Sequence, residues 1–154
     1  LQITVRSYSD EVRETLLSGI ERIAVKQAEA MGFPADKRPE VTIRDEYTPS
    51  LWNDPALVAR GVAAMRDELG DAALVEIPKE MGGEDFSRYG RTAAKIPSFM
   101  IRVGTVPEDL FERAQRGEAT LPSLHSPFFA PDPEPTLDTG RRAITAMVRD
   151  LLAP

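Results

Sequence analysis

The chain has 154 residues, of which 42% are apolar, and a formal net charge of −6 at pH 7, so it is long enough for one domain or for parts of two. Acidic and basic residues are interspersed, and no Lys/Arg cluster of the kind that binds phosphates is present. No apolar run approaches the ~18 residues of a membrane span. Cysteine is absent. We therefore expect a cytoplasmic protein that binds neither nucleic acid nor membrane and that has no disulfide, thiolate metal site or cysteine nucleophile.

The first fifty residues predict a strand, a long helix and a second strand. Apolar and polar residues alternate over 2–8 and 41–47, which is the pattern of strands with one buried face. Between them, Ser9 is a good N-cap for an apolar stripe at helical spacing, and Gly32 is placed to end the helix. Such a β-α-β unit leaves apolar surface uncovered, so residues 1–50 are predicted to be half of a ferredoxin-like domain that needs a partner.

The turn-forming residues 48–55 separate this strand-helix-strand pattern from a different order of predicted elements, and we interpret them as an interdomain hinge. Asp54 and Gly70 are placed to begin and end a helix, a short strand is predicted over 73–77, and the apolar run 98–103 predicts a strand buried on both faces.

The remainder predicts a short charged helix opened by Pro107, a proline-rich irregular stretch that includes 127–135, and a closing helix. One face of that helix is apolar and consists of Leu137, Ile144, Met147, Val148 and Leu151. The predicted fold class is therefore α/β, with an α+β portion over residues 1–50 and the C-terminal part of an α/β domain over residues 51–154.

His125 is the only histidine, and it lies in the stretch Leu124-His125-Ser126-Pro127. Imidazole is the commonest protein metal ligand and a common general base. A single histidine in an apolar-flanked loop is more often an ordinary packed or surface residue, so composition alone leaves both readings open.

A second candidate is the stretch from Met81 to Phe86, which reads Met-Gly-Gly-Glu-Asp-Phe. Gly82 and Gly83 free the backbone to turn sharply and to approach a ligand, and Glu84 and the following aspartate are placed to open a short helix. The alternative is a plain strand-to-helix turn. Adjacent carboxylates point in different directions in regular structure, so they do not form an acid/base pair by themselves.

Three acidic residues near the C-terminus, Asp132, Glu134 and Asp138, lack the spacing of a calcium loop, and we interpret them as solvated. Nucleophile-elbow, phosphate-loop and dinucleotide motifs are absent as well.

The Met-Gly-Gly-Glu-Asp-Phe stretch, the Leu-His-Ser-Pro stretch about forty residues later and the closing amphipathic helix together resemble the C-terminal half of a family. This is the family of zinc-dependent amidohydrolases and peptidases that includes hippurate hydrolases, N-acyl-amino-acid amidohydrolases, aminoacylases and auxin-conjugate hydrolases. The resemblance covers essentially the whole chain, with residues 1–50 similar to the second half of the family's lid domain.

What the resemblance implies is a zinc-peptidase-like catalytic domain with two divalent metal ions and a four-stranded lid that often dimerises. It makes His125 the last metal ligand and puts Gly82, Gly83 and Glu84 beside the substrate cleft. The implied substrate is an N-acyl amino acid or a related conjugate, whose amide bond is hydrolysed. The implied partners are the missing N-terminal half and a second copy, which forms a homo-oligomer through the lid.

Two departures from the family pattern limit what this chain does by itself. The other metal ligands and the glutamate general base belong to an N-terminal half that this sequence lacks, and one imidazole cannot hold a catalytic zinc, which takes about three protein ligands. We therefore expect the chain to be a fragment, without retained metal and inactive alone. The segment from Thr105 to Pro122 is also longer than the family's usual link.

Two alternatives stay open. One is a non-catalytic dimerisation or interaction module in which His125 is merely structural. The other is a metal-free small-molecule binder derived from the same family.

Overall fold

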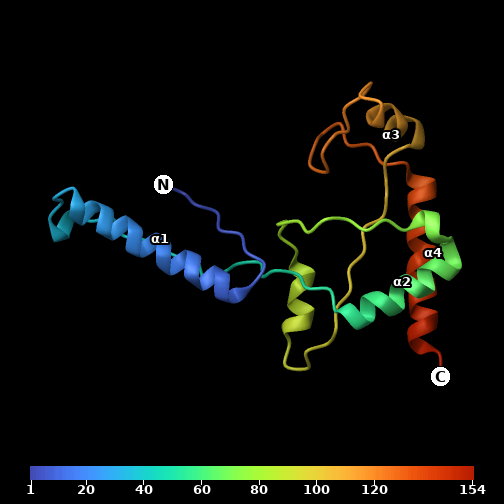
Figure 1. The fold of residues 1–154 in the computed structure, drawn as a ribbon, viewed down its shortest axis with the longest axis horizontal. Coiled ribbons are helices and arrows are strands. Elements are labelled where there is room, and N and C mark those ends of the chain that lie inside the picture. The colour runs from blue at the N-terminus through green and yellow to red at the C-terminus, as the bar shows by residue number, and fades with distance from the viewer. The chain divides into compact units, whose positions relative to one another are not determined.

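The computed structural model describes residues 1–154, and its regular secondary structure is entirely helical, with no β-strand (Figure 1). Its elements are α1 (Asp10–Ala30), η1 (Ala35–Lys37), α2 (Pro55–Leu69), η2 (Asp71–Ala73), η3 (Asp85–Arg91), α3 (Glu108–Gln115) and α4 (Pro133–Leu152), where η marks a 3-10 helix. The predicted α/β class, with a half ferredoxin-like domain and a zinc-peptidase-like α/β domain, is therefore wrong. None of the helices is both long enough and apolar enough to cross a bilayer.

The predicted strands are absent because a strand needs a neighbouring strand to bind its backbone. Residues 2–8, 41–47 and 98–103 form no backbone ladder, and 73–77 begins at the end of η2 and continues without regular structure. Alternation of apolar and polar residues describes the two faces of an extended chain, but a strand also needs a neighbour to take its N–H and C=O groups. These segments have no such neighbour within the chain.

The chain divides into two compact units, residues 1–53 with 77–98 (unit 1) and residues 54–76 with 99–154 (unit 2). Whether this division carries the predicted lid and catalytic roles stays a prediction.

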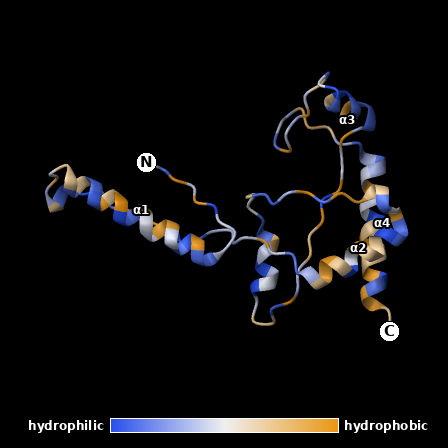
Figure 2. Cartoon of the chain, viewed as in Figure 1, coloured by the Kyte–Doolittle hydropathy of each residue, from blue (hydrophilic) through white to orange (hydrophobic).

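Unit 1 contains α1, whose predicted beginning and end are confirmed. The Ser9 hydroxyl accepts a hydrogen bond from the Val12 N–H at 3.2 Å, and Gly32 follows the helix with φ of +79°, a conformation that glycine adopts without strain. Hydrophobic residues recur along α1 in Figure 2, yet no residue of the helix is buried. Ile23 is 59% exposed and Met31 72%, so much of the apolar stripe faces outward.

Arginines hold residues 77–98 to the rest of unit 1. Arg91 pairs with Asp10 at the start of α1, Arg88 donates to the Tyr47 carbonyl, and Arg6 Nη1 donates to the Met81 carbonyl at 2.8 Å. Exposed contacts of this kind each contribute little to stability.

Unit 2 is built on the packing of α2 against α4. The Asp54 carboxylate accepts from the Leu57 N–H at 2.9 Å and Gly70 ends the helix with φ of +86°, which confirms the predicted bounds of α2. The core of the unit lies where Met65 of α2, 4% exposed, and Ala143 of α4, 3% exposed, are buried.

The helix α4 differs from its prediction at both its start and its buried face. It begins at Pro133, inside the proline-rich stretch, because proline in the first turn removes only N–H groups that have no helical partner. Of the predicted apolar face, Leu137 is 72% exposed and Ile144 58%, whereas Ala143 is buried. The predicted short helix after Pro107 is confirmed as α3.

Candidate functional site

His125 lies in unit 2, in the connection between α3 and α4, and its side chain is exposed. Two consecutive turns shape the connection: the Ser126 N–H donates to the Ser123 carbonyl at 2.9 Å, and the Phe129 N–H donates to the Ser126 carbonyl at 3.0 Å. The Ser126 hydroxyl also accepts from the Phe128 N–H at 3.1 Å. The sequence thus presents the imidazole on a hydrogen-bonded turn.

The side chains around His125 do not fit a complete metal centre. Nowhere in the chain do three His, Asp or Glu side chains gather as a metal site would require. A catalytic zinc takes about three protein ligands, so these 154 residues alone do not supply the two-metal site that the family resemblance implies.

Glu84 lies in unit 1, where it begins η3. Its Oε1 accepts a hydrogen bond from the Phe86 N–H at 3.1 Å, so the carboxylate caps the helix that it was predicted to open. The side chain is half-buried. Any role of Glu84 toward a substrate has to compete with this cap.

Gly82 and Gly83 precede that cap and are exposed. Neither has a positive φ, and a Cβ added to either would meet no atom within 4 Å. The backbone conformation of the chain therefore does not require glycine at either position. Glycine at these positions leaves the backbone open to solvent.

The two predicted motifs belong to different units, with His125 in unit 2 and Gly82, Gly83 and Glu84 in unit 1. Within its own unit, each motif consists of exposed or half-buried residues.

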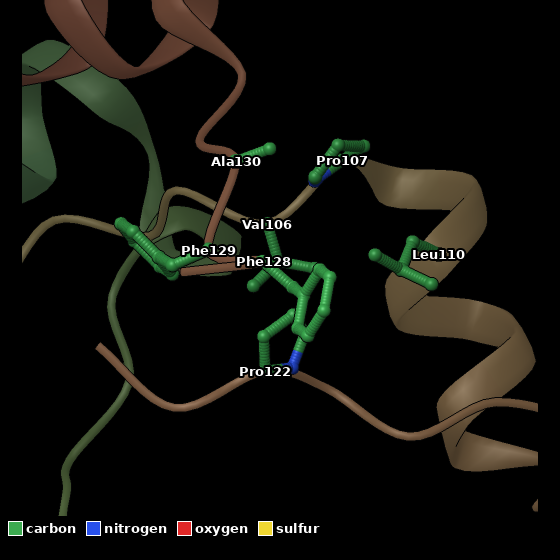
Figure 3. A pocket seen from close by; sticks show the side chains of 7 residues that line it. All are labelled: Val106, Pro107, Leu110, Pro122, Phe128, Phe129 and Ala130. Atoms are coloured by element: carbon green, nitrogen blue, oxygen red, sulfur yellow. The ribbon is translucent and has the colours of Figure 1, made fainter. Parts of the chain in front are cut away.

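Sequence reasoning missed an apolar pocket in unit 2 (Figure 3). Its lining residues come from α3, from the residues just before it and from the connection that carries His125: they are Val106, Pro107, Leu110, Pro122, Phe128, Phe129 and Ala130. The signal that points to it is the pair of adjacent phenylalanines just after Leu-His-Ser-Pro, because Phe128 is 82% exposed and has no core to fill.

Shifted pKa values occur away from the two motifs. A hydrogen bond from Lys26 lowers the pKa of Glu29, with Arg38 acting in the same direction, and a hydrogen bond to Glu68 raises the pKa of Arg142. Lys26 and Glu29 lie on α1, and the Arg142–Glu68 pair joins α4 to α2. We interpret both as structural ion pairs.

No family model matches the chain, and no solved structure matches it. The resemblance to zinc-dependent amidohydrolases therefore rests on the two motifs, their order and their spacing.

Proposed function

We propose that the chain is the C-terminal part of a metal-dependent amidohydrolase that hydrolyses the amide bond of N-acyl amino acids or related conjugates. The observation that carries the proposal is the order of Met-Gly-Gly-Glu-Asp-Phe, then Leu-His-Ser-Pro, then the amphipathic α4. An exposed imidazole on a hydrogen-bonded turn supports it, because such a side chain can bind a metal ion together with ligands from another polypeptide segment.

The proposal assigns His125 as one metal ligand and Gly82 and Gly83 as backbone that a substrate approaches. Glu84 orients substrate or a neighbouring side chain. The remaining ligands and the general base come from polypeptide outside these 154 residues, and two divalent ions, most simply zinc, occupy the completed site. Because the chain does not gather three ligands, we expect it to be inactive alone. The proposal includes a cytoplasmic location, which a chain without cysteine fits, and a homo-oligomer formed through residues 1–50.

The test is a hydrolysis assay on the longest natural polypeptide that contains the chain, with N-acetyl amino acids as substrates and added zinc. We expect His125→Ala to lower kcat/KM by at least ~100-fold, since even residues behind the ligands contribute 10–100-fold. Leu124→Ala is the matched control, because it removes an exposed neighbour from the same turn without removing a ligand. Metal-dependent hydrolysis by the 154-residue chain itself would contradict the fragment assignment.

A second candidate is a non-catalytic interaction module, and the exposed apolar surface of unit 1 favours it. Ile3, Ile23, Met31, Phe33 and Ile43 are all between 42% and 72% exposed. Exposed apolar side chains on one unit mark an interaction site where they form a contiguous patch. Under this alternative Ile23→Asp lowers self-association or partner binding, and His125→Ala changes neither association nor any hydrolysis; sedimentation and the same assay separate the two candidates.

A further inference from the structure

The helix α4 has two apolar faces, and only one of them is packed. On the packed face Ala143 is buried and Met147 lies against Gly61 of α2. The other face, which we call the outer stripe, consists of four side chains that are between 43% and 72% exposed: Leu137, Ile144, Val148 and Leu151. Their spacing of seven, four and three residues places them in one line along the helix. The chain itself therefore leaves this apolar line in contact with water.

The outer stripe is complementary to itself. Leu137 lies seven residues before Ile144, and Leu151 lies seven residues after it. In two antiparallel copies of α4 with Ile144 opposite Ile144, each Leu137 is therefore level with Leu151 of the other copy. The same patch then forms both sides of a two-fold interface, as in most homodimers.

Charges beside the outer stripe match in the same pairing. At 3.6 residues per turn, Asp138 and Arg149 lie about 100° and 120° round the helix from Leu137, which puts them on one flank of the stripe. An antiparallel two-fold pair brings like flanks together, with Asp138 within about 1.5 Å of the level of Arg149 in the other copy. In a parallel pair the two levels differ by about 16 Å, so only the antiparallel pair brings these opposite charges together.

Both charged side chains are available for this contact. Asp138 and Arg149 are exposed, and the hydrogen bond that Asp138 accepts from Arg141 at 2.7 Å uses only its Oδ1 atom. The Oδ2 atom can therefore accept from an arginine of the other copy.

We infer that the outer stripe is a dimerisation surface, on which α4 of a second copy of this chain packs antiparallel with Ile144 on the two-fold axis. A second copy is the occupant because both the apolar spacing and the flanking charges are complementary to themselves. Four side chains are far fewer than the roughly 20–30 residues on each side of a standard interface, so the dimer is weak and depends on concentration. The inference goes beyond the proposed function and uses neither of its two motifs.

The test is disulfide cross-linking of single-cysteine variants, because the chain has no cysteine of its own. A disulfide needs Cα atoms within about 7 Å of each other. Ile144→Cys puts the two thiols on the axis, and we expect it to form a covalent dimer under mild oxidation. Leu137→Cys puts them about 21 Å apart along the axis and should stay monomeric, whereas a mixture of Leu137→Cys and Leu151→Cys should cross-link.

Sedimentation equilibrium measures the reversible association of the chain. Ile144→Asp should raise the dimer Kd at least ~100-fold, because two like charges then replace two apolar side chains on the axis. Ile23→Asp, at an exposed apolar position of α1, is the matched control, and in the Ile144→Cys background it should leave cross-linking unchanged. Circular dichroism shows whether each variant keeps its helices.

The same variants can overturn the inference. Cross-linking of Leu137→Cys as efficient as that of Ile144→Cys, or a chain that stays monomeric at millimolar concentration, would do so. The longest natural polypeptide that contains the chain supplies a further arm: if Ile144→Cys cross-links in the 154-residue chain but not in that polypeptide, another segment covers the outer stripe and the inference is wrong. These readouts involve no metal and no hydrolysis, so their outcome is distinguishable from that of the proposed function.

Discussion

Replacing Gly83 tests whether glycine is needed at this position for folding or for activity. A Cβ there meets no atom of the chain within 4 Å and the backbone has no positive φ, so Gly83→Ala should change the free energy of unfolding by less than ~0.5 kcal/mol. Under the proposed function the added methyl group lies where the substrate approaches, and kcat/KM of the longer polypeptide falls. Denaturant unfolding and the hydrolysis assay measure the two effects.

Gly104→Ala is the matched control for that variant, because its surroundings are equally open and it lies in neither motif. Equal activity of the two alanine variants would contradict the placement of Gly83 at a substrate cleft.

The sequence identified His125 and the residues around Glu84 as candidates, but it could not identify their surroundings. Turn and cap interactions are local, so the helix begun by Glu84 was predictable from a few neighbouring residues. Whether other ligands gather around His125 depends on contacts between distant residues, which spacing does not encode. The pocket was missed for the same reason, since Leu110 and Phe128 come together only through the fold.

Among the elements, the two helical glycines Gly61 and Gly19 have opposite surroundings. A Cβ on Gly61 of α2 would lie 2.7 Å from Phe99 Cε1 and 3.4 Å from Met147 Cε, whereas a Cβ on Gly19 of α1 would meet nothing within 4 Å. Crowding in a packed interface costs about 1–3 kcal/mol and the helix propensity of alanine returns roughly 1 kcal/mol.

We therefore expect Gly61→Ala to destabilise the chain by about 1 kcal/mol and Gly19→Ala to stabilise it by a similar amount. Urea unfolding monitored by circular dichroism measures both. Stabilisation by Gly61→Ala would show that α2 and α4 do not pack as described.

The end of α1 should respond to acid through Glu29. Its pKa is lowered from the ordinary value of 4.5, chiefly by the hydrogen bond from Lys26. Because the folded pKa is the lower one, this contribution to stability is fully present above pH 4.5 and is lost as the pH falls through the folded value. The amide NMR signals of the last turn of α1 should therefore show fraying at low pH.

Glu29→Gln provides the comparison, because it removes the titrating group and keeps the shape of the side chain. Its last turn should fray to the same extent above and below pH 4.5. If fraying of the last turn of α1 depends on pH in the same way in the variant and the wild type, titration of Glu29 does not cause it.

The bounds of α1 and α2 were predictable from this sequence, whereas the strands predicted from it are absent. Ser9, Asp54 and Gly70 act through hydrogen bonds and backbone angles within one turn of themselves, so the bounds of α1 and α2 follow from local residues. The alternating residues 41–47 need a partner strand, and the chain does not provide one.

At the scale of the whole molecule, little apolar surface is buried for a chain of this length. Met65 and Ala143 are the only buried hydrophobic residues, and both belong to unit 2. Unit 1 keeps apolar side chains of α1 in contact with water. Covering that surface lowers its free energy, so a polypeptide that does so stabilises unit 1.

The central claim is that His125 is one ligand of a metal site completed by polypeptide outside these residues. The metal content of the longest natural polypeptide that contains the chain, measured by mass spectrometry as moles of metal per mole of protein, tests it most directly. The account predicts about two divalent ions in the wild type and in Leu124→Ala, and a loss of at least about one in His125→Ala. A wild-type protein without metal, or a His125→Ala variant that keeps its full metal content, would contradict it.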